Sequence, residues 1–346
     1  MDSNTYAKAG VNVVKAEKFV DRLKSRARRP AHDKLWRGAG GYAAVVPLND
    51  SEAVALTTDG VGTKLLLAVE YGRLETIGID LVAMCANDII CVGATPHSFL
   101  DYYATPSLDD AQADAIINGI VAGADQAGML LVGGETAELP GLYAEHHFDL
   151  AGFAMGTVKR EELLTGAEIK PGDTVIGIAS NGIHSNGLSL ARQVIPASEK
   201  IRQELLTPTL IYVKPAIEAL SRHRGALAGM ANITGGGWRN LFRLNDQVGF
   251  TIDKPLPLPA VLGRLQQDVP QEEMYKTFNM GMGLAVISRP AAAKEIAIIF
   301  AQHGFTAQVV GAVTAERGTM VINTESHGGK AKSLTLAESE IKVKRG

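Results

Sequence analysis

The chain has 346 residues, of which 46% are hydrophobic and 21% charged, an ordinary globular composition in a length that suits two domains. A formal net charge of -3 excludes the broadly basic surface of a non-specific nucleic-acid binder. No segment approaches the roughly eighteen apolar residues of a membrane helix and no apolar leader stands at the N-terminus, so we expect a cytoplasmic protein without a membrane partner.

The two cysteines and the one basic cluster are explained without a function. Cys85 and Cys91 lie six residues apart in one apolar helical run, roughly 9 Å along the helix axis, which is too far for a disulfide. We expect both to be small buried side chains in a reducing compartment. The basic cluster at 22–29 is short, which favours a solvated helix face or lid segment over a polyanion site.

Strands and helices alternate along the first half of the chain. A helix is expected at 16–26, followed by a glycine-bearing loop at 38–42. In the helix expected at 107–126, Asp109 and Asp110 stand at the positive end and Gly128 stops the last turn. The other elements expected here are strands at 53–58, 98–103, 129–132 and 149–158 and a helix at 78–93.

A turn at 170–173 is the predicted domain boundary, dividing the chain into 1–169 and 170–346. After it the alternation starts again, which predicts an α/β or α+β fold in both halves. The polar tail from Thr324, with its charged stretch at 330–344, is expected to fray. The elements expected in this half are strands at 174–179, 249–252, 284–288 and 307–313 and helices at 186–194, 209–221, 258–267 and 290–303.

The first candidate site is the segment TTDGVGTK at 57–64, directly after a strand. Gly60 and Gly62, with Thr63, would let the backbone approach an anion, and Asp59 would offer an oxygen ligand to Mg²⁺. The spacing of a P-loop is absent. The alternative is a tight turn that needs two glycines and binds nothing.

The second candidate site lies on the apolar helix at 78–93. Asp80, Met84 and Asn87 fall along one stripe of this helix, with Asp88 beside it. Asp80 could be a helix cap. Asp88 stands in the middle of apolar residues and therefore needs a partner or a metal ion.

The third candidate site follows the strand expected at 129–132, where two glycines precede Glu135 and Glu138. Two carboxylates three residues apart at a strand end could form a ledge for Mg²⁺, which proteins hold with a few carboxylates and nucleotide phosphates. A polar β-turn is the alternative for either acid.

Three glycine-rich turns in the second half complete the candidates. The turn at 179–187 carries His184, the turn at 233–238 carries Gly235 and Gly236, and a third lies at 275–283. Backbone N–H groups bind phosphate where such a turn begins a helix. These turns therefore indicate phosphate groups that are held by the main chain. His184 could equally be an ordinary loop histidine.

Nine sequence blocks, in one fixed order between about Tyr6 and Gly311, carry a family resemblance. The chain resembles the aminoimidazole ribonucleotide synthetases of purine biosynthesis, also called phosphoribosylformylglycinamidine cyclo-ligases. One block alone would be weak evidence, whereas nine in family order are specific. The blocks are TTDGVGTK, GIDLVAMCANDI, FLDYYAT, LVGGETAELPGLY, AGFAMG, IHSNGLSL, TPTLIYVK, ITGGG and EMYKTFNMGMG.

The resemblance implies a fold and a metal site. The N-terminal domain would join its sheet to that of a dimer mate to form a barrel, with a C-terminal α/β domain behind it. Related ATP-binding enzymes include formylglycinamidine ribonucleotide synthetase, selenophosphate synthetase and thiamine-monophosphate kinase. Asp88, in an N-D-[IL] helix, would bind the metal, Asp59 would be a second metal or phosphate-shell position, and Glu135 a third acid.

The resemblance also implies a reaction. ATP would phosphorylate the formyl oxygen of formylglycinamidine ribonucleotide, and attack by the amidine-side nitrogen on the resulting iminophosphate would close the ring, giving aminoimidazole ribonucleotide, ADP and phosphate. ATP and Mg²⁺ are the expected cofactors, with K⁺ as an additional cation, in a homodimer. Lys64 would lie near the phosphates, and His184 would lie near the substrate. Gly40 and Gly41 would belong to a lid over the nucleotide, and Asn87 would line the nucleotide site.

Two segments depart from the family pattern. The lid has the sequence RGAGGY at 37–42, where the family usually has more glycine and a phenylalanine, and WRNLFR follows the glycine triplet, where the family tends to have a glutamate and a proline. These departures leave open a paralogue with an altered substrate. A small-molecule kinase or phosphotransferase of the selenophosphate or thiamine-phosphate type is a second hypothesis, and a non-catalytic ATP-binding module is a third.

Overall fold

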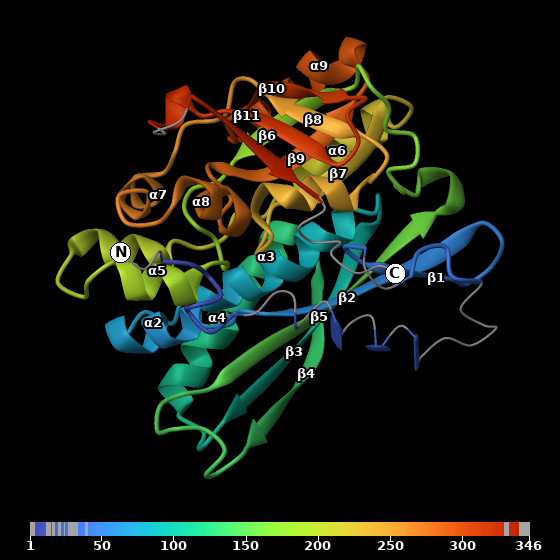
Figure 1. Ribbon diagram of the computed structural model, residues 1–346. Helices are drawn as coiled ribbons and strands as arrows, with labels where there is room; N and C mark the ends of the chain where they lie inside the picture. Colours follow the sequence, from blue (N-terminus) through green and yellow to red (C-terminus); the bar gives the residue numbers. More distant parts are fainter. Residues whose placement is uncertain are drawn as a thin grey trace.

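Two β-sheets with helices between and around them make up the computed structural model, one sheet from each half of the chain (Figure 1). Parts of the helix predicted at 16–26 and of the basic cluster, Gly40 and most of the 330–344 stretch lie outside the described residues, and the described residues between 18 and 26 are helical. The structure describes residues 4–11, 15, 18–19, 22–23, 25–26, 34–38, 41–328 and 332–338.

The first sheet has the strand order β1-β2-β5-β3-β4 and is antiparallel except for the parallel pair β3–β4. Side chains of β5 alternate between buried and more exposed positions from Leu150 to Val158, so only one face of the sheet is covered. The strands are β1 (Ala44–Pro47), β2 (Glu52–Gly60), β3 (Thr95–Thr105), β4 (Leu130–Glu138) and β5 (Asp149–Lys159).

The second sheet has the order β12-β11-β8-β10-β6-β9-β7, in which only the pair β8–β11 is parallel. Helices α6 (Val213–His223) and α9 (Pro290–Gln302) pack against each other beside it. The strands are β6 (Thr174–Ala179), β7 (Leu227–Asn232), β8 (Gly249–Ile252), β9 (Met282–Ser288), β10 (Ala307–Thr314), β11 (Thr319–Asn323) and β12 (Ser333–Ala337).

Helix α3 (Ile77–Ile90) lies between the two sheets (Figure 1) and buries 12 of its 14 residues. It packs on the first sheet and on α4 (Asp110–Ala127), and its other side contacts α6 and β7. The approach to α4 is close because a Cβ on Gly78 would lie 2.2 Å from the backbone nitrogen of Ile120. Both halves of the protein therefore use α3 as shared core.

The remaining helices are short and lie around this core. The helix predicted at 107–126 is α4, which begins at Asp110 after a capping Asp109, whose carboxylate accepts from the backbone N–H of Gln112. As predicted, Gly128 ends it, in the left-handed conformation. The others are α2 (Lys64–Tyr71), α5 (Leu188–Val194), α7 (Ala260–Leu265), α8 (Gln271–Thr277), η2 (Arg160–Glu162), η3 (Lys200–Leu206), η4 (Gly237–Arg243) and η5 (Glu325–His327).

The predominance of antiparallel pairs decides for α+β between the two predicted fold classes. Two expectations about strand ends were wrong. β4 does not stop at its glycines but pairs with β3 through Glu138, and part of the tail expected to fray forms β12, which pairs with β11. Helices α2 and α8 and strands β1, β7 and β11 were not expected, because they are short or lack a clear apolar period.

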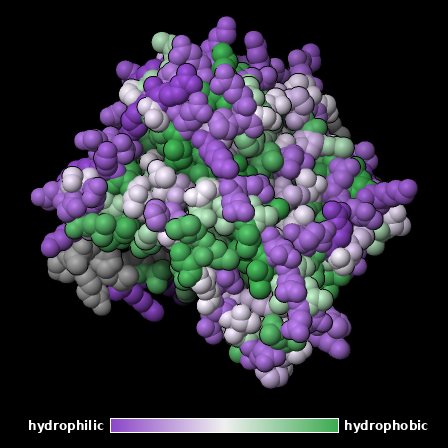
Figure 2. Space-filling model, turned by 180° about the vertical axis from the view of Figure 1, so that it is seen from behind, coloured by the Kyte–Doolittle hydropathy of each residue, from purple (hydrophilic) through white to green (hydrophobic). Residues whose placement is uncertain are grey.

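Hydrophobic side chains also reach the surface, and Figure 2 shows them gathered across the middle of one face, bordered by hydrophilic ones. In the described part of the chain, no helix combines the length and the hydrophobicity that crossing a bilayer requires.

Candidate functional site

The carboxylates of Asp59 and Asp88 are near enough to interact electrostatically, and Asp88 also bonds to the second half of the chain. Asp59 lies near the end of β2 and its Oδ1 accepts from the backbone N–H of Gly60 at 2.8 Å. Asp88 lies in the last turn of α3 and accepts from the Asn232 side chain at 2.8 Å. Two elements of the first half and one of the second thus build the pair.

Both carboxylates are held in a state that favours a bound cation. Burial raises the pKa of Asp88 to about 7, the Asn232 hydrogen bond opposes this shift, and the negative charge of Asp59 adds to it. Burial also raises the pKa of Asp59. A divalent cation would relieve this desolvation and repulsion. Within the described residues no group of three or more His, Cys, Asp or Glu could hold a metal, so water and phosphate oxygens would supply the other ligands.

Arg243, at the end of η4, is a cation beside this pair that the sequence did not single out. Its charge lowers the pKa of both Asp59 and Asp88, against the larger effect of burial. Its Nη2 donates to the carbonyl of Gly41 at 2.9 Å, and its guanidinium lies 4.4 Å from the centre of the Tyr42 ring. The only signal in the sequence was that Arg243 stands in a segment departing from the family pattern.

Lys64 lies in a buried ion pair instead of facing an open phosphate site. Its side chain is fully buried, and its Nζ lies 2.9 Å and 2.8 Å from the two oxygens of Asp80. The same Nζ donates to the carbonyls of Thr207 at 2.7 Å and His184 at 3.5 Å. All its donors are therefore directed at protein groups, and its expected place near the phosphates stays a prediction.

Asp80 is the centre of this network and not the helix cap that the sequence allowed. The capping position of α3 is Thr76, and Asp80 lies one turn further on, fully buried. Its Oδ1 accepts from the backbone N–H of Thr209 at 2.7 Å, from the Thr209 hydroxyl at 2.5 Å and from the Ser185 hydroxyl at 3.0 Å. One carboxylate of the first half thus binds two loops of the second.

Asn87 holds the same two halves together one turn before the end of α3. Its Nδ2 donates to the carbonyl of Leu210 at 2.8 Å, and its Oδ1 accepts from the backbone N–H of Tyr212 at 2.9 Å. The side chain is fully buried. The amide is therefore bonded to the main chain of 210–212, and its expected place in the nucleotide site stays a prediction.

His184 lies in the buried network, in a left-handed backbone conformation with φ of 61° that is uncommon outside glycine. Burial, with the neighbouring charge of Lys64, lowers the pKa of His184 to about 3. Its Nε2 is buried with no hydrogen-bond partner among the described residues. The imidazole is consequently neutral at physiological pH and offers no positive charge to a substrate phosphate.

Several of the predicted glycine turns meet around α3. The Thr63 hydroxyl lies 3.0 Å from that of Ser189, after Gly62 has turned the chain with a φ of 68°. A Cβ on Gly235 would lie 3.0 Å from the Asn186 side chain, and one on Gly236 would lie 2.8 Å from that of Asn240. The turn at 181–189 therefore lies beside both the turn at 60–63 and the turn at 235–237.

Glu135 is not brought into this region. It pairs with Tyr102, which pairs with Ala151, whereas Asp59 pairs with Gly152. Ala151 and Gly152 are neighbours on β5 and point to opposite faces, so Glu135 lies on the uncovered face of the sheet and Asp59 on the covered one. In addition, β4 is three strands away from β2 in this sheet, roughly 14 Å. Within one chain it cannot share a metal ion with Asp59 and Asp88, so the predicted three-acid grouping is wrong in that respect.

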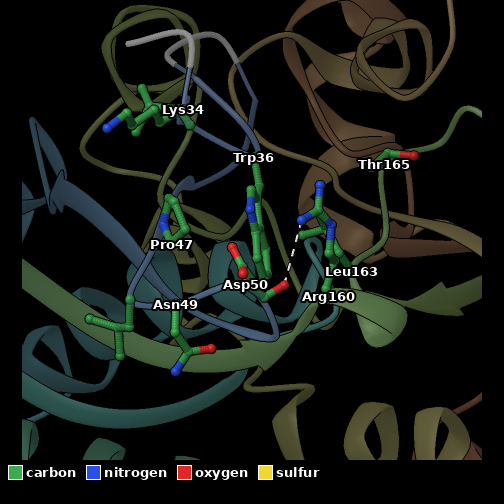
Figure 3. Close-up of a pocket in the computed structure, with 10 residues that line it drawn as sticks. Lys34, Trp36, Pro47, Asn49, Asp50, Arg160, Leu163 and Thr165 are labelled. Atoms are coloured by element: carbon green, nitrogen blue, oxygen red, sulfur yellow. Dashed lines mark hydrogen bonds between the residues drawn. The ribbon is translucent and has the colours of Figure 1, made fainter. Parts of the chain in front are cut away.

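A cavity of about 810 Å³ lies elsewhere, beside the β1–β2 turn, and none of the predicted site residues lines it. Figure 3 shows the Arg160 side chain beside the Trp36 indole in the lining, with the guanidinium 5.1 Å from the indole centre. Arg160 donates to the Asp50 carbonyl at 3.5 Å. The only carboxylate lining the cavity is that of Asp50, so it lacks the paired acids found at Asp59 and Asp88.

Comparison with known proteins agrees with this geometry. Family models described as AIR synthase related protein, N-terminal and C-terminal domain, match residues 40–158 and 170–323. A Chromobacterium violaceum protein named phosphoribosylformylglycinamidine cyclo-ligase is 42% identical over 335 residues, covering 91% of this chain and 96% of that protein.

Two solved structures share the fold. A chain of a HypE–HypF complex has a TM-score of 0.67 and 17% identity, covering 94% of this chain and 99% of that one. T. maritima PurL complexed with ATP has a TM-score of 0.62 and 18% identity, covering 96% of this chain and 52% of that one.

Replacing Lys64 with methionine should lower the free energy of unfolding by about 3–5 kcal/mol, because the buried Asp80 charge loses its cation. Adding Asp80→Asn should recover part of this loss, since the second change removes the uncompensated charge. Urea unfolding of the two single variants and the double variant measures the coupling. Lys159→Met, which breaks an exposed pair with Glu162, is the control and should change stability little. Strict additivity of the two buried changes would contradict the ion-pair interpretation.

Replacing His184 with asparagine should reduce the loss of stability in acid. The folded pKa of about 3 lies below the ordinary histidine value, so the unfolded chain binds the proton first and stability falls as pH falls from about 7 towards 3. At pH 5 this term amounts to about 2 kcal/mol, and asparagine, which tolerates the left-handed backbone, removes it. Thermal unfolding at pH 7.5 and 5 tests the difference. His146→Asn, at an exposed histidine with φ of 64°, should behave as wild type, and equal behaviour of the two variants would refute the assignment.

Proposed function

The chain belongs to the AIR synthase related family, and from that premise we propose that it closes the imidazole ring of aminoimidazole ribonucleotide. ATP and formylglycinamidine ribonucleotide would be its substrates, and ADP and phosphate the other products. The relative named as a cyclo-ligase supports this over nearly the full length of both chains. The structural observation that carries the proposal is the pair Asp59–Asp88 beside the junction of the two halves, where burial raises both pKa values despite the positive charge of Arg243.

Mg²⁺ fits the donors of this pair, because it prefers carboxylate oxygens together with phosphates and water. Asp59 and Asp88 would hold it, and the ion would neutralise the phosphate charge that develops during transfer to the formyl oxygen. The amides around Gly60, Gly62 and Gly235 would approach the phosphates closely, because glycine has no side chain of its own. T. maritima PurL, which shares the fold, has been solved with ATP bound, which supports a nucleotide in this architecture.

The buried network gives Lys64 and His184 supporting roles. Lys64 opens α2 directly after the 60–63 turn, so its ion pair with Asp80 would fix that turn against the second half. His184, held neutral, would keep the 181–189 turn in place beside it. We therefore assign both residues to positioning and reserve direct contact with the metal for Asp59 and Asp88.

The open face of the first sheet supports a homodimer. Its apolar side chains are exposed, from 41% at Leu100 to 61% at Leu130, and the β-pairing places them on one face. Such a continuous patch marks an interface in a soluble protein. The exposed members of this face are Leu56, Leu100, Leu130 and Phe153.

We keep the domain boundary at the 170–173 turn, which separates the last element of the first half, η2, from β6.

Cys85 and Cys91 are both free and buried, which suits a cytoplasmic location.

Replacing Phe153 with aspartate should break the homodimer, because a charge would be buried in the apolar interface. Light scattering at micromolar concentration should give twice the chain mass for wild type and a lower mass for the variant. Ile298→Asp is matched, since both side chains are 45% exposed in this chain, and it should stay dimeric. A monomeric wild type, or two variants with the same mass, would count against the dimer.

Release of ADP should depend on formylglycinamidine ribonucleotide, with Mg²⁺ and K⁺ supplied, and should stop when EDTA removes Mg²⁺. Asp88→Asn keeps an oxygen for the Asn232 hydrogen bond but loses the charge, so kcat/KM should fall by about 100-fold or more. Asp50→Asn, at the cavity of Figure 3, is the control and should leave turnover unchanged.

Turnover with a selenide or thiamine-monophosphate acceptor, and none with the ribonucleotide, would replace this proposal by the kinase hypothesis. Unchanged activity of Asp88→Asn would remove the carboxylate pair from the mechanism.

A further inference from the structure

Two segments that the resemblance led us to expect as departures from the family pattern contact each other. Gly41 and Tyr42 belong to the first departure and Asn240 and Arg243 to the second, 202 residues away along the chain. The Gly41 carbonyl accepts from Arg243, the Tyr42 ring lies under the guanidinium, and the Tyr42 hydroxyl donates to the Asn240 carbonyl at 3.1 Å. Two hydrogen bonds and one cation–π contact thus join two segments that lie far apart in the sequence.

These contacts suit an arginine better than a lysine. A guanidinium can stack its plane on an aromatic ring while an N–H at its edge donates to a carbonyl, whereas an ammonium is a compact point charge without a planar edge. The ring of Tyr42 is only 4% exposed, so it offers a fixed surface for this cation. Arg243 itself lies at the surface and remains accessible to a ligand.

The other side of Gly41 is also enclosed. A Cβ on Gly41 would lie 2.5 Å from Nε of Arg37, so the residue is packed between two arginines. Arg37 is itself fixed, because its Nη1 donates to the carbonyls of Leu164 and Thr165 and its backbone pairs with Val45. Arg243 therefore supplies the contact from the second half to a segment that the first half already holds.

The location of this contact connects it to the candidate site. Arg243 acts electrostatically on both Asp59 and Asp88, and Tyr42 follows Gly41 directly, with its carbonyl accepting from Thr57 of β2 at 3.4 Å. Contacts of the 41–42 segment therefore run both to the strand that carries Asp59 and to η4 of the second half.

We propose that Arg243 is a positioning residue which, through Gly41 and Tyr42, latches the 41–42 segment to the second half beside Asp59 and Asp88 and so sets the affinity for the nucleotide. The structural part, the latch, is independent of the proposed reaction. The part concerning affinity rests on the proposed function, because it requires Mg·ATP to bind at the carboxylate pair.

Two measurements on the full-length chain separate these parts. Hydrogen exchange of the backbone amides at 41–46 without ligand reports on the latch, and the Kd of a non-hydrolysable ATP analogue with Mg²⁺ reports on affinity. In Arg243→Lys, which keeps the charge, exchange should rise and the analogue should bind about tenfold more weakly, as expected for losing one partly buried cation–π contact and its hydrogen bond. KM for ATP should rise while kcat at saturating ATP stays within about twofold.

Further variants test the details of the latch. Tyr42→Phe keeps the ring and loses only the bond to Asn240, so it should fall between wild type and Arg243→Lys in both measurements. Arg222→Lys, at an exposed arginine paired with Glu218 on α6, is the control and should change neither.

Unchanged exchange in Arg243→Lys would overturn the latch. Unchanged exchange together with weaker binding would show that Arg243 contacts the nucleotide directly and would overturn its positioning role. Increased exchange with unchanged affinity would overturn the link to the nucleotide. If wild type binds no analogue, the proposed function fails at its nucleotide site, while the exchange measurement still decides on the latch.

Discussion

The buried ion pair between Lys64 and Asp80 is the interaction on which the arrangement of the two halves depends. Both side chains are inaccessible to solvent, and burying two charges costs more than their attraction returns unless the remaining donors and acceptors are satisfied. Asp80 meets that condition with groups of the second half, Thr209 and Ser185, and Lys64 meets it with the Thr207 carbonyl. The charges can therefore be buried only when the two halves are in register, which makes the pair a determinant of their orientation.

Helix α3, which carries Asp80, also carries Asp88, whose charge has fewer partners within the protein. Asp88 lies eight residues after Asp80, roughly 12 Å along α3, and of the hydrogen-bond donors described above only Asn232 reaches it. A rigid helix fixes the distance between a carboxylate that the protein neutralises and one that it does not. The first orders the junction between the halves and the second leaves an unmet demand for positive charge there. This division explains how a structural network and a candidate metal site share one element.

The sequence predicted the parts of this arrangement that depend on local pattern. Asp88 was singled out because a charge amid Ile89 and Ile90 is costly without a partner, and the structure shows that it stays poorly compensated. The partners of Asp80 could not be predicted, because Thr209 lies 129 residues away and no local pattern connects the two. Glu135 was misplaced for another reason. Its face depends on the register of β3 with β4, which includes a shift between Phe99 and Leu100 that no composition or spacing reveals.

The two segments expected to depart from the family pattern are a further case in which a contact between distant residues could not be predicted from the sequence. Taken singly, Tyr42 in a glycine loop and Arg243 in the segment after the glycine triplet indicate only that a substrate could differ. In the structure they are one contact, so a change in one segment has consequences for the other. Contacts of this kind hold a segment without touching the reacting atoms, and they leave the carboxylate pair itself unaltered. The side chains that fix the 41–42 segment are thus distinct from the two carboxylates, so the proposed metal ligands and the contact beside them can be altered independently.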